Sequence, residues 1–156
     1  MNYKLKTIIK VILLTFVVFS VVYAIIGETG KNKSANDNQA LKETGNKIIV
    51  YYFHGNARCT SCYRIEEWSY QAITEKFPKE IQEGKLEWRL ANVEDADNQH
   101  FVKDFSLHTK SIVLVQIKDG KQVKWKNLEK VWDYLRDKDR FTNYVDEETN
   151  EFLKGI

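Results

Sequence analysis

Cys59 and Cys62 are the only cysteines in the 156-residue chain, and two residues separate them. They follow an apolar, β-forming run at 47–53 and open a helical pattern that continues to Phe77. At the start of a helix, free backbone N–H groups and the positive end of the dipole favour thiolate over thiol at the first cysteine. We therefore predict a redox-active disulfide, with Cys59 as the attacking thiol and Cys62 as the resolving thiol.

Two other roles for this cysteine pair are open at the level of sequence. One is an inert structural disulfide. The other is a metal site, although one Cys-x-x-Cys supplies only two of the four ligands that structural zinc takes. His54, His100 and His108 are the side chains that could complete such a set. We expect no separate cofactor and no resident metal.

Polar side chains close to the motif could support the thiol chemistry. Arg58 immediately precedes the first cysteine and could lower its pKa, and Arg64 flanks the motif on the other side. Glu66 lies one helical turn after the resolving cysteine and could take its proton. The alternative for Glu66 is a solvated pair with Glu67. His54, at the end of the preceding strand, is either a catalytic residue or an ordinary turn residue.

The elements around the motif alternate between strand and helix. Apolar runs without polar alternation predict strands covered on both faces. Helical periodicity, caps and Pro78 set the expected helix boundaries. The expected strands are 48–53, 86–93, 111–117 and 122–125, the last two joined by the Asp119–Gly120 turn. The expected helices are 60–77, 95–107, one beginning after Asn127, and one through 141–153. The order is β-α-β-α-β-β-α, an α/β class.

Residues 51–66, YYFHGNARCTSCYRIE, carry a resemblance to a known family. With 92–94, 104–107 and 125–128, this segment resembles the thioredoxin-like proteins of the ArsF family, named as a subunit of a nitrophenyl compound nitroreductase. The resemblance implies a thioredoxin fold and a redox-type Cys-x-x-Cys, and the name implies an association with arsenic or nitroaromatic chemistry. No flavin or dinucleotide motif accompanies it.

One stretch departs from the wider thioredoxin pattern. Thioredoxins carry a cis-proline just before the third strand, whereas residues 107–112 contain no proline. Because a non-proline cis bond is costly, we expect a trans peptide there. Thr109, Lys110 or Ser111 must then occupy the space that the proline ring fills. That substitution leaves room for a soft metal ion such as zinc or Cu(I) beside the two thiolates.

The N-terminal segment predicts a membrane location. Lys4, Lys6 and Lys10 lie before or within the start of an apolar run that ends at Ile26. With 7–10 included, the segment nears the length of a spanning helix, and the positive-inside rule places the remainder outside the cytoplasm. We favour a retained single-pass anchor at 1–27 over a cleaved signal peptide, because the apolar run exceeds a typical signal core.

Composition separates the rest of the chain into a tether and a domain. Residues 28–46 are polar and rich in Asn and charge, which indicates a flexible tether. Residues 47–156 suffice for one domain with a single core. This part holds 18 Lys and Arg against 19 Asp and Glu, so its net charge is 18 − 19 = −1, and no phosphate-binding surface is indicated. Nucleic acid is therefore not an expected partner.

These observations together predict a membrane-tethered, extracytoplasmic thiol–disulfide oxidoreductase of thioredoxin-like fold. It would face the periplasm or the cell exterior and act on protein thiols or disulfides through Cys59 and Cys62, with Arg58, His54, Glu66, Thr109 and Ser111 in support. Two alternatives stay open: a metal-binding or metal-delivery module, and a non-catalytic subunit that docks a reductase.

Overall fold

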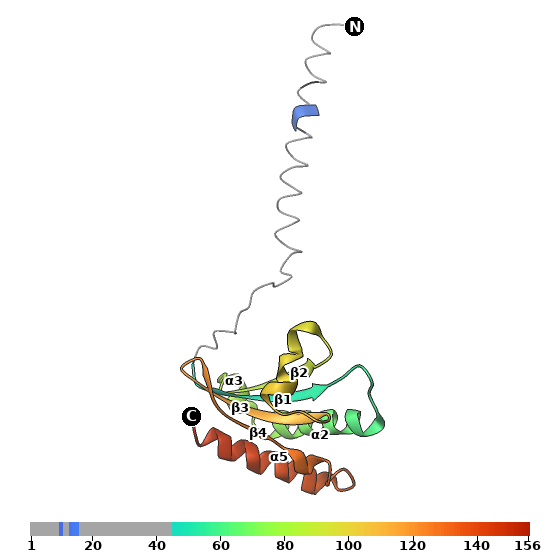
Figure 1. The fold of residues 1–156 in the computed structure, drawn as a ribbon. Coiled ribbons are helices and arrows are strands. Elements are labelled where there is room, and N and C mark those ends of the chain that lie inside the picture. The colour runs from blue at the N-terminus through green and yellow to red at the C-terminus, as the bar shows by residue number, and fades with distance from the viewer. Residues whose placement is uncertain (1–9, 11–12, 16–44) are drawn as a thin grey trace. The chain divides into compact units, whose positions relative to one another are not determined.

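A computed structural model describes residue 10, residues 13–15 and residues 45–156 of the chain (Figure 1). No helix within those ranges has the length and apolar character needed to cross a membrane. Nearly all of the predicted anchor and of the predicted tether falls outside the described residues. Residues 45–156 form a folded domain.

The centre of the domain is a four-stranded mixed sheet. Its strands are β1 (Lys47–His54), β2 (Leu86–Asn92), β3 (Ser111–Lys118) and β4 (Lys121–Asn127). Their order across the sheet is β2-β1-β3-β4. β1 runs parallel to β2 and antiparallel to β3, which in turn pairs antiparallel with β4. Both central strands are almost wholly buried, as their unbroken apolar runs predict.

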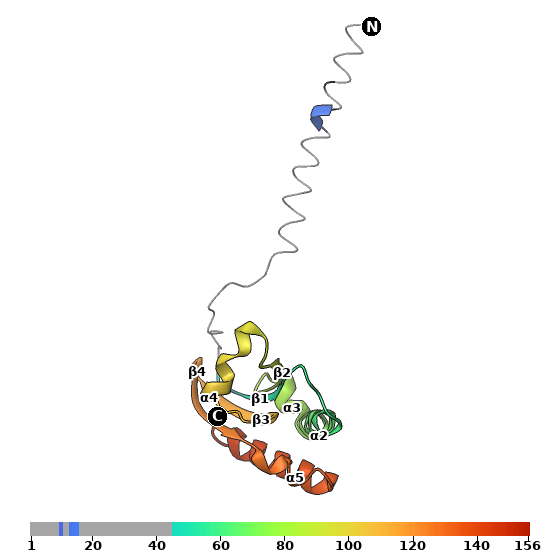
Figure 2. The same ribbon diagram turned by 45° about the vertical axis from the view of Figure 1, so that its right-hand side comes forward.

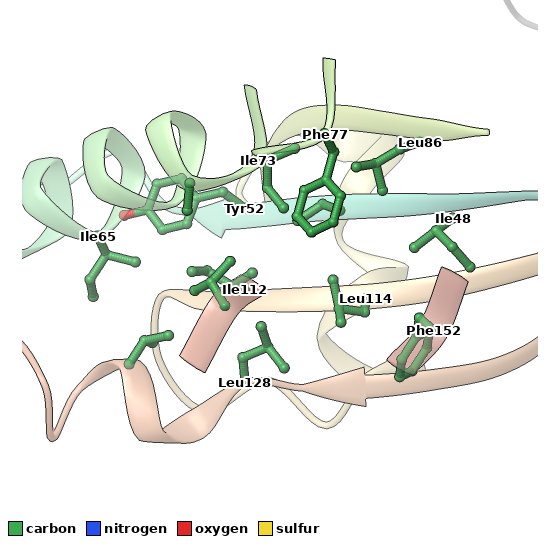
Figure 3. Close-up of a cluster of buried hydrophobic side chains, with 14 of the residues drawn as sticks. Ile48, Tyr52, Ile65, Ile73, Phe77, Leu86, Ile112, Leu114, Leu128 and Phe152 are labelled. Carbon is green, nitrogen blue, oxygen red and sulfur yellow. The ribbon is translucent and has the colours of Figure 1, made fainter. Parts of the chain in front are cut away.

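Alternate side chains of β1 serve two different cores. Ile48, Val50 and Tyr52 pack with residues of the two long helices, α2 (Thr60–Lys76) and α5 (Lys138–Leu153). Figure 3 shows this core between the sheet and the helices. The residues between them face the opposite side, where they meet the short helix α4 (His100–Asp104). Helices therefore cover both faces of β1, and the helix α2 that begins with the cysteine motif is held by the larger core (Figure 2).

The buried face of α2 is the one that the helical period predicts. Cys62, Ile65, Ser69, Ala72 and Ile73 are buried at intervals of three and four residues. Burying this stripe fixes the rotation of the helix about its axis. The second cysteine therefore points towards the domain interior, while the first residues of the helix stay at the surface.

One short helix was not expected and two expected helices are wrong, each for a local reason. Pro78 follows the end of α2, but it also begins a short helix, α3 (Pro78–Gln82), since proline is well suited to a first helical position. The helix expected at 95–107 is divided into a 3₁₀ turn, η1 (Ala96–Asn98), and α4. In place of a helix after Asn127 there is one 3₁₀ turn, η2 (Glu129–Val131), followed by turns up to α5.

Candidate functional site

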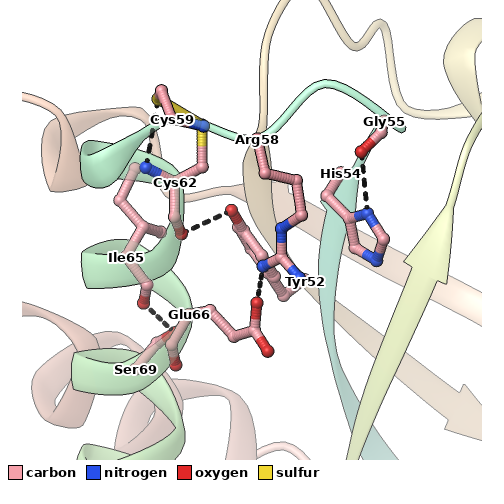
Figure 4. Close-up of polar contacts among 9 residues, drawn as sticks. All are labelled: Tyr52, His54, Gly55, Arg58, Cys59, Cys62, Ile65, Glu66 and Ser69. Atoms are coloured by element: carbon pink, nitrogen blue, oxygen red, sulfur yellow. Dashed lines mark hydrogen bonds and ion pairs between the residues drawn. A yellow bond between two sulfur atoms is a disulfide. The ribbon is translucent and has the colours of Figure 1, made fainter.

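Cys59 and Cys62 form a disulfide across the first turn of α2, with Cα atoms 5.0 Å apart. Cys59 is the N-cap residue of the helix, and its Sγ accepts a hydrogen bond from the backbone N–H of Cys62 at 3.3 Å. The backbone N–H of Cys59 donates in return to Sγ of Cys62 at 3.0 Å. The two sulfur atoms thus take the capping places that serine and glutamate side chains occupy at other helices (Figure 4).

The strand order β2-β1-β3-β4, with a Cys-x-x-Cys disulfide at the start of the helix after β1, is the arrangement that the sequence resemblance implies. The element order of the domain and the place of its cysteine motif are those of a thioredoxin-like fold. Its sheet, its redox motif and the position of that motif on a helix N-terminus agree with the expected fold.

The two sulfurs differ sharply in exposure. Cys59 is exposed, whereas only 1 % of Cys62 is accessible. Tyr52 on β1 fixes the inner cysteine further, because its hydroxyl donates to the Cys62 carbonyl at 2.7 Å. Burial raises the pKa of the Tyr52 phenol, and the nearby Arg58 guanidinium opposes that rise. The phenol therefore keeps its proton and remains a donor to the helix.

Arg58 and Glu66 form an ion pair beneath the disulfide, on the side of Tyr52 (Figure 4). Both side chains are largely withdrawn from solvent, with 20 % and 25 % of their areas exposed. The Arg58 guanidinium also lies over the ring of Tyr63, 4.4 Å from its centroid. Glu66 therefore lies against Arg58 and is no solvated partner of Glu67. Arg58 and Glu66 lie on the two flanks of the motif, and the structure brings them together.

The other polar residues singled out in the sequence make contacts separate from the Arg58–Glu66 pair. Nδ1 of His54 is 3.1 Å from the carbonyl oxygen of its neighbour Gly55, the contact of a turn residue. Arg64 points along the helix, where its Nη1 donates to the Leu135 carbonyl at 3.1 Å and its guanidinium covers Trp68. His100 lies on α4, where its Nδ1 is 2.7 Å from the carboxylate of Asp104.

The loop before β3 is held without a proline. Every peptide bond in the described residues is trans, which confirms the expectation for this loop. The hydroxyl of Ser111, which is buried, donates to the Thr109 carbonyl at 2.9 Å. The indole N–H of Trp132 donates to the Lys110 carbonyl at 2.9 Å. Ser111 also pairs with Phe53 in the sheet, so the loop lies at the same sheet end as the cysteine motif.

Two surface cavities lie on either side of this loop. The larger, about 240 Å³, has an apolar floor and a rim that includes His54, His108 and Lys110. The smaller, about 180 Å³, is bounded by the loop and by Trp132. His54 and His108 thus share one cavity, as a metal site beside the thiols would need. Within the described ranges, however, no three or more His, Cys, Asp and Glu side chains are grouped to hold a metal ion, and metal binding by the reduced protein stays a prediction.

Sequence reasoning missed two contacts at this end of the domain. One is the contact of Trp132, which anchors the loop before β3. Glu94, which follows β2, accepts two hydrogen bonds from Asn56 in the loop between β1 and the motif. No periodicity could reveal either contact, since each joins a polar group in one connection to a residue more than 20 positions away.

Comparison with known proteins adds little to these observations. No protein-family model and no curated protein matches the chain. Among solved structures, the chain is similar to a Fasciola hepatica thioredoxin, with 23 % identity and a TM-score of 0.36 over 60 % of this chain and 81 % of that one. A structure described as that of a malarial protein is 16 % identical, with a TM-score of 0.35 over 52 % of this chain and 80 % of that one.

Proposed function

We propose that the domain is a thiol–disulfide oxidoreductase that exchanges a disulfide with a protein partner. The observation that carries the proposal is the asymmetry of the Cys59–Cys62 disulfide. Cys59 is exposed at a helix N-terminus, where a partner can reach it, and Cys62 is buried behind it. An inert structural disulfide needs no such asymmetry, whereas attack followed by resolution does.

The exchange takes two steps when the domain acts as a reductant. The Cys59 thiolate attacks one sulfur of the partner's disulfide, and the partner's S–S bond breaks to release a thiolate that takes up a proton. Cys62 then loses its proton and attacks Sγ of Cys59, which forms the intramolecular disulfide and releases the partner's second thiolate. Two electrons pass from the domain to the partner, and the reverse sequence oxidises a partner dithiol.

Side chains on both sides of the motif support these steps. The backbone N–H of Cys62 and the N-terminal dipole of α2 stabilise the Cys59 thiolate. We assign Glu66 the proton of Cys62, because residue 66 follows Cys62 by one helical turn and its side chain is largely withdrawn from water. Its partner Arg58 keeps the carboxylate in place.

The proposed partner-binding surface includes three further residues, Thr109, Ser111 and His54. Thr109 and His54 line the larger cavity, which lies at the same end of the sheet as the motif, and Ser111 shapes the loop that borders it. The N-terminal segment contributes the location. A single-pass anchor at 7–26 would hold the domain on the extracytoplasmic side, supported by the lysines that precede the apolar run.

The resemblance to the ArsF family bears on the partner. It favours a reductase of nitroaromatic or arsenic compounds as a protein that the domain would reduce or dock. The support is limited to the quoted segments around the motif and in three later stretches.

Trapping of a mixed disulfide tests the function. In Cys62→Ser, the Cys59 thiolate can attack a partner but the product cannot be resolved, so we expect a covalent complex that a reductant releases. Cys59→Ser, which keeps the buried thiol, is the matched control and should trap nothing. Equal trapping by both variants, or none by Cys62→Ser, would remove the proposal. A Cys59→Ser variant with full cellular function would instead favour a non-catalytic docking subunit.

A further inference from the structure

The loop that carries Cys59 is attached to the segment after β2 by one carboxylate. Glu94 accepts from Asn56 twice: the backbone N–H donates to Oε1 at 2.8 Å, and Nδ2 donates to Oε2 at 2.8 Å. Both carboxylate oxygens are therefore bound to the same residue. This two-point attachment fixes the orientation of Asn56 as well as its position.

A second asparagine closes the arrangement. Nδ2 of Asn92 donates to Oδ1 of Asn56 at 2.8 Å and to Asp95 at 3.1 Å. Oδ1 of Asn92 accepts from the backbone N–H of Glu94 at 3.2 Å. Both polar atoms of the Asn56 side chain are thus engaged, and its conformation is determined by the β2 side.

The residue before Asn56 is fitted to this carboxylate. Gly55 is buried, and a Cβ atom added to it would lie 2.3 Å from Oε1 of Glu94. A side chain at this position would displace the carboxylate and break its hydrogen bonds to Asn56. The close approach of loop and carboxylate therefore depends on the absence of a side chain at position 55.

The attached loop leads directly to the reactive sulfur. Three residues after Asn56, Cys59 must place its Sγ as the acceptor for the Cys62 N–H at the start of α2. Stabilisation of a thiolate by a helix N-terminus falls off within the first turn, so a small displacement of Cys59 weakens it. The other carboxylate near the motif, Glu66, contacts this loop at a different residue, through its ion pair with Arg58.

We propose that Glu94 is a positioning residue for the thiol chemistry, acting through Asn56 on the location of Cys59. The inference rests on the proposed thiol function for its consequence, but the attachment itself can be tested separately. It predicts a result for variants in which the side chain at position 56 no longer offers a donor to an acceptor at position 94. In these variants the pKa of the Cys59 thiol should be higher, and its attack on a disulfide should be slower.

A double-mutant cycle tests this inference. Glu94→Gln sets an amide N–H₂ against the donors of Asn56, and Asn56→Asp sets two carboxylates against each other. Combining both substitutions restores a donor facing an acceptor. Glu129→Gln, at an exposed carboxylate after β4, removes the same charge without touching the loop and is the control.

In each reduced variant, the pKa of Cys59 is measured from the pH dependence of its alkylation, and attack is measured with a small aromatic disulfide. Urea unfolding reports stability in parallel. We expect each single substitution to raise the pKa of Cys59 and to lower the rate constant of its attack by about three- to tenfold. In the double variant that rate constant should return to within about twofold of the value for the unmodified protein.

Unchanged pKa and rates in folded single variants would overturn the inference, and so would single-variant defects that the double variant does not correct. If Glu94→Gln and Glu129→Gln caused equal defects, the loss of one negative charge would explain both. That result would also overturn the inference. If Cys62→Ser traps no partner while the cycle behaves as expected, the proposed function fails and the positioning role stands.

Discussion

Arg58 and Glu66 lie eight residues apart, on opposite flanks of the cysteine motif, and pair beneath it with most of both side chains withdrawn from solvent. Many thioredoxins have a buried acid on the first strand, whereas this chain has Tyr51, Tyr52 and Phe53 in that stretch. Here a carboxylate comes from the helix instead, accompanied by its own cation. The same end of the domain can therefore provide a proton acceptor although its first strand holds no acid.

Glu66→Gln should slow resolution of the mixed disulfide. Without the carboxylate, Cys62 must lose its proton to water, and we expect resolution about 10²-fold slower at neutral pH. The deficit should shrink as the pH rises towards the thiol's own pKa, because the thiolate then forms unaided. Stopped-flow release of a labelled peptide thiol measures the rate, and Glu67→Gln, at an exposed neighbour, is the control. A deficit that does not vary with pH would contradict the proton-transfer role.

Alkylation of the reduced domain should modify Cys59 first. Its sulfur is exposed at the helix N-terminus, while Cys62 is 1 % accessible. With limiting iodoacetamide near pH 7, peptide mass analysis should find label on Cys59 at least about tenfold more often. In urea, where the helix is lost, the two cysteines should label almost equally. Preferential labelling of Cys62 in the folded domain would reverse the assigned roles.

Gly55→Ala should destabilise the domain because of the carboxylate beside it. The added Cβ would lie 2.3 Å from Glu94, whose hydrogen bonds to Asn56 must then break. We expect a loss of about 1–2 kcal/mol in the free energy of unfolding, measured in urea. In a Glu94→Ala background the same substitution should cost much less, since the obstructing carboxylate is absent. Equal costs in both backgrounds would place the strain elsewhere.

The strands and the main helix could be predicted because each carries a local signal. Unbroken apolar runs predicted β1 and β3, and the three-to-four spacing of buried residues predicted α2. For residues 127–137 the sequence predicted a helix, which is wrong. There Leu128 and Val131 enter the core, as they would from a helix, but the Trp132 indole is bound to the Lys110 carbonyl and the chain turns instead. This contact joins residues 22 positions apart, and no window of local sequence reports it.

The site was predictable in part, for the same reason. The cysteines, Arg58 and Glu66 lie within eight residues of one another on a strand–helix junction, so spacing placed them near each other. The contact of Asn56 with Glu94 spans 38 residues between two connections. Its members are exposed polar residues with no periodic neighbours, and only the parallel pairing of β1 with β2 brings them together.

Asp146→Asn should stabilise the domain above acidic pH. Burial raises the pKa of the Asp146 carboxyl, against the opposing effect of Lys76, and its Oδ1 is buried without a hydrogen-bond partner in the described residues. An acid whose pKa is raised on folding binds protons more tightly in the folded state, so stability falls as pH rises through the interval from its unfolded pKa to its raised folded value.

The variant should therefore gain roughly 0.5–1 kcal/mol in the free energy of unfolding at pH 7, and the gain should vanish below the unfolded pKa of aspartate. Urea titrations at pH 7 and pH 3 measure both. Asp133→Asn, at an exposed position before α5, is the control and should change little. A gain of equal size at both pH values would assign it to packing.

A reporter fused after Ile156 tests the location. The lysines before the apolar run predict a cytoplasmic N-terminus and an external domain. A reporter that is active only outside the cytoplasm should therefore be active, and a cytoplasmic reporter at the same position silent. The reverse result would place the cysteines in a reducing compartment and favour a reductant role for the pair.

The indole of Trp132 holds the loop before β3 through one hydrogen bond to the Lys110 carbonyl. A prolyl ring would restrain that backbone covalently, whereas a single hydrogen bond contributes only about 0.5–1.5 kcal/mol and opens in a measurable fraction of molecules. If the loop borders the proposed partner-binding surface, this restraint would let that surface adjust to more than one backbone shape. Trp132 is one of four tryptophans in the chain, so in a variant with the other three replaced by phenylalanine its fluorescence would report whether this hydrogen bond is formed.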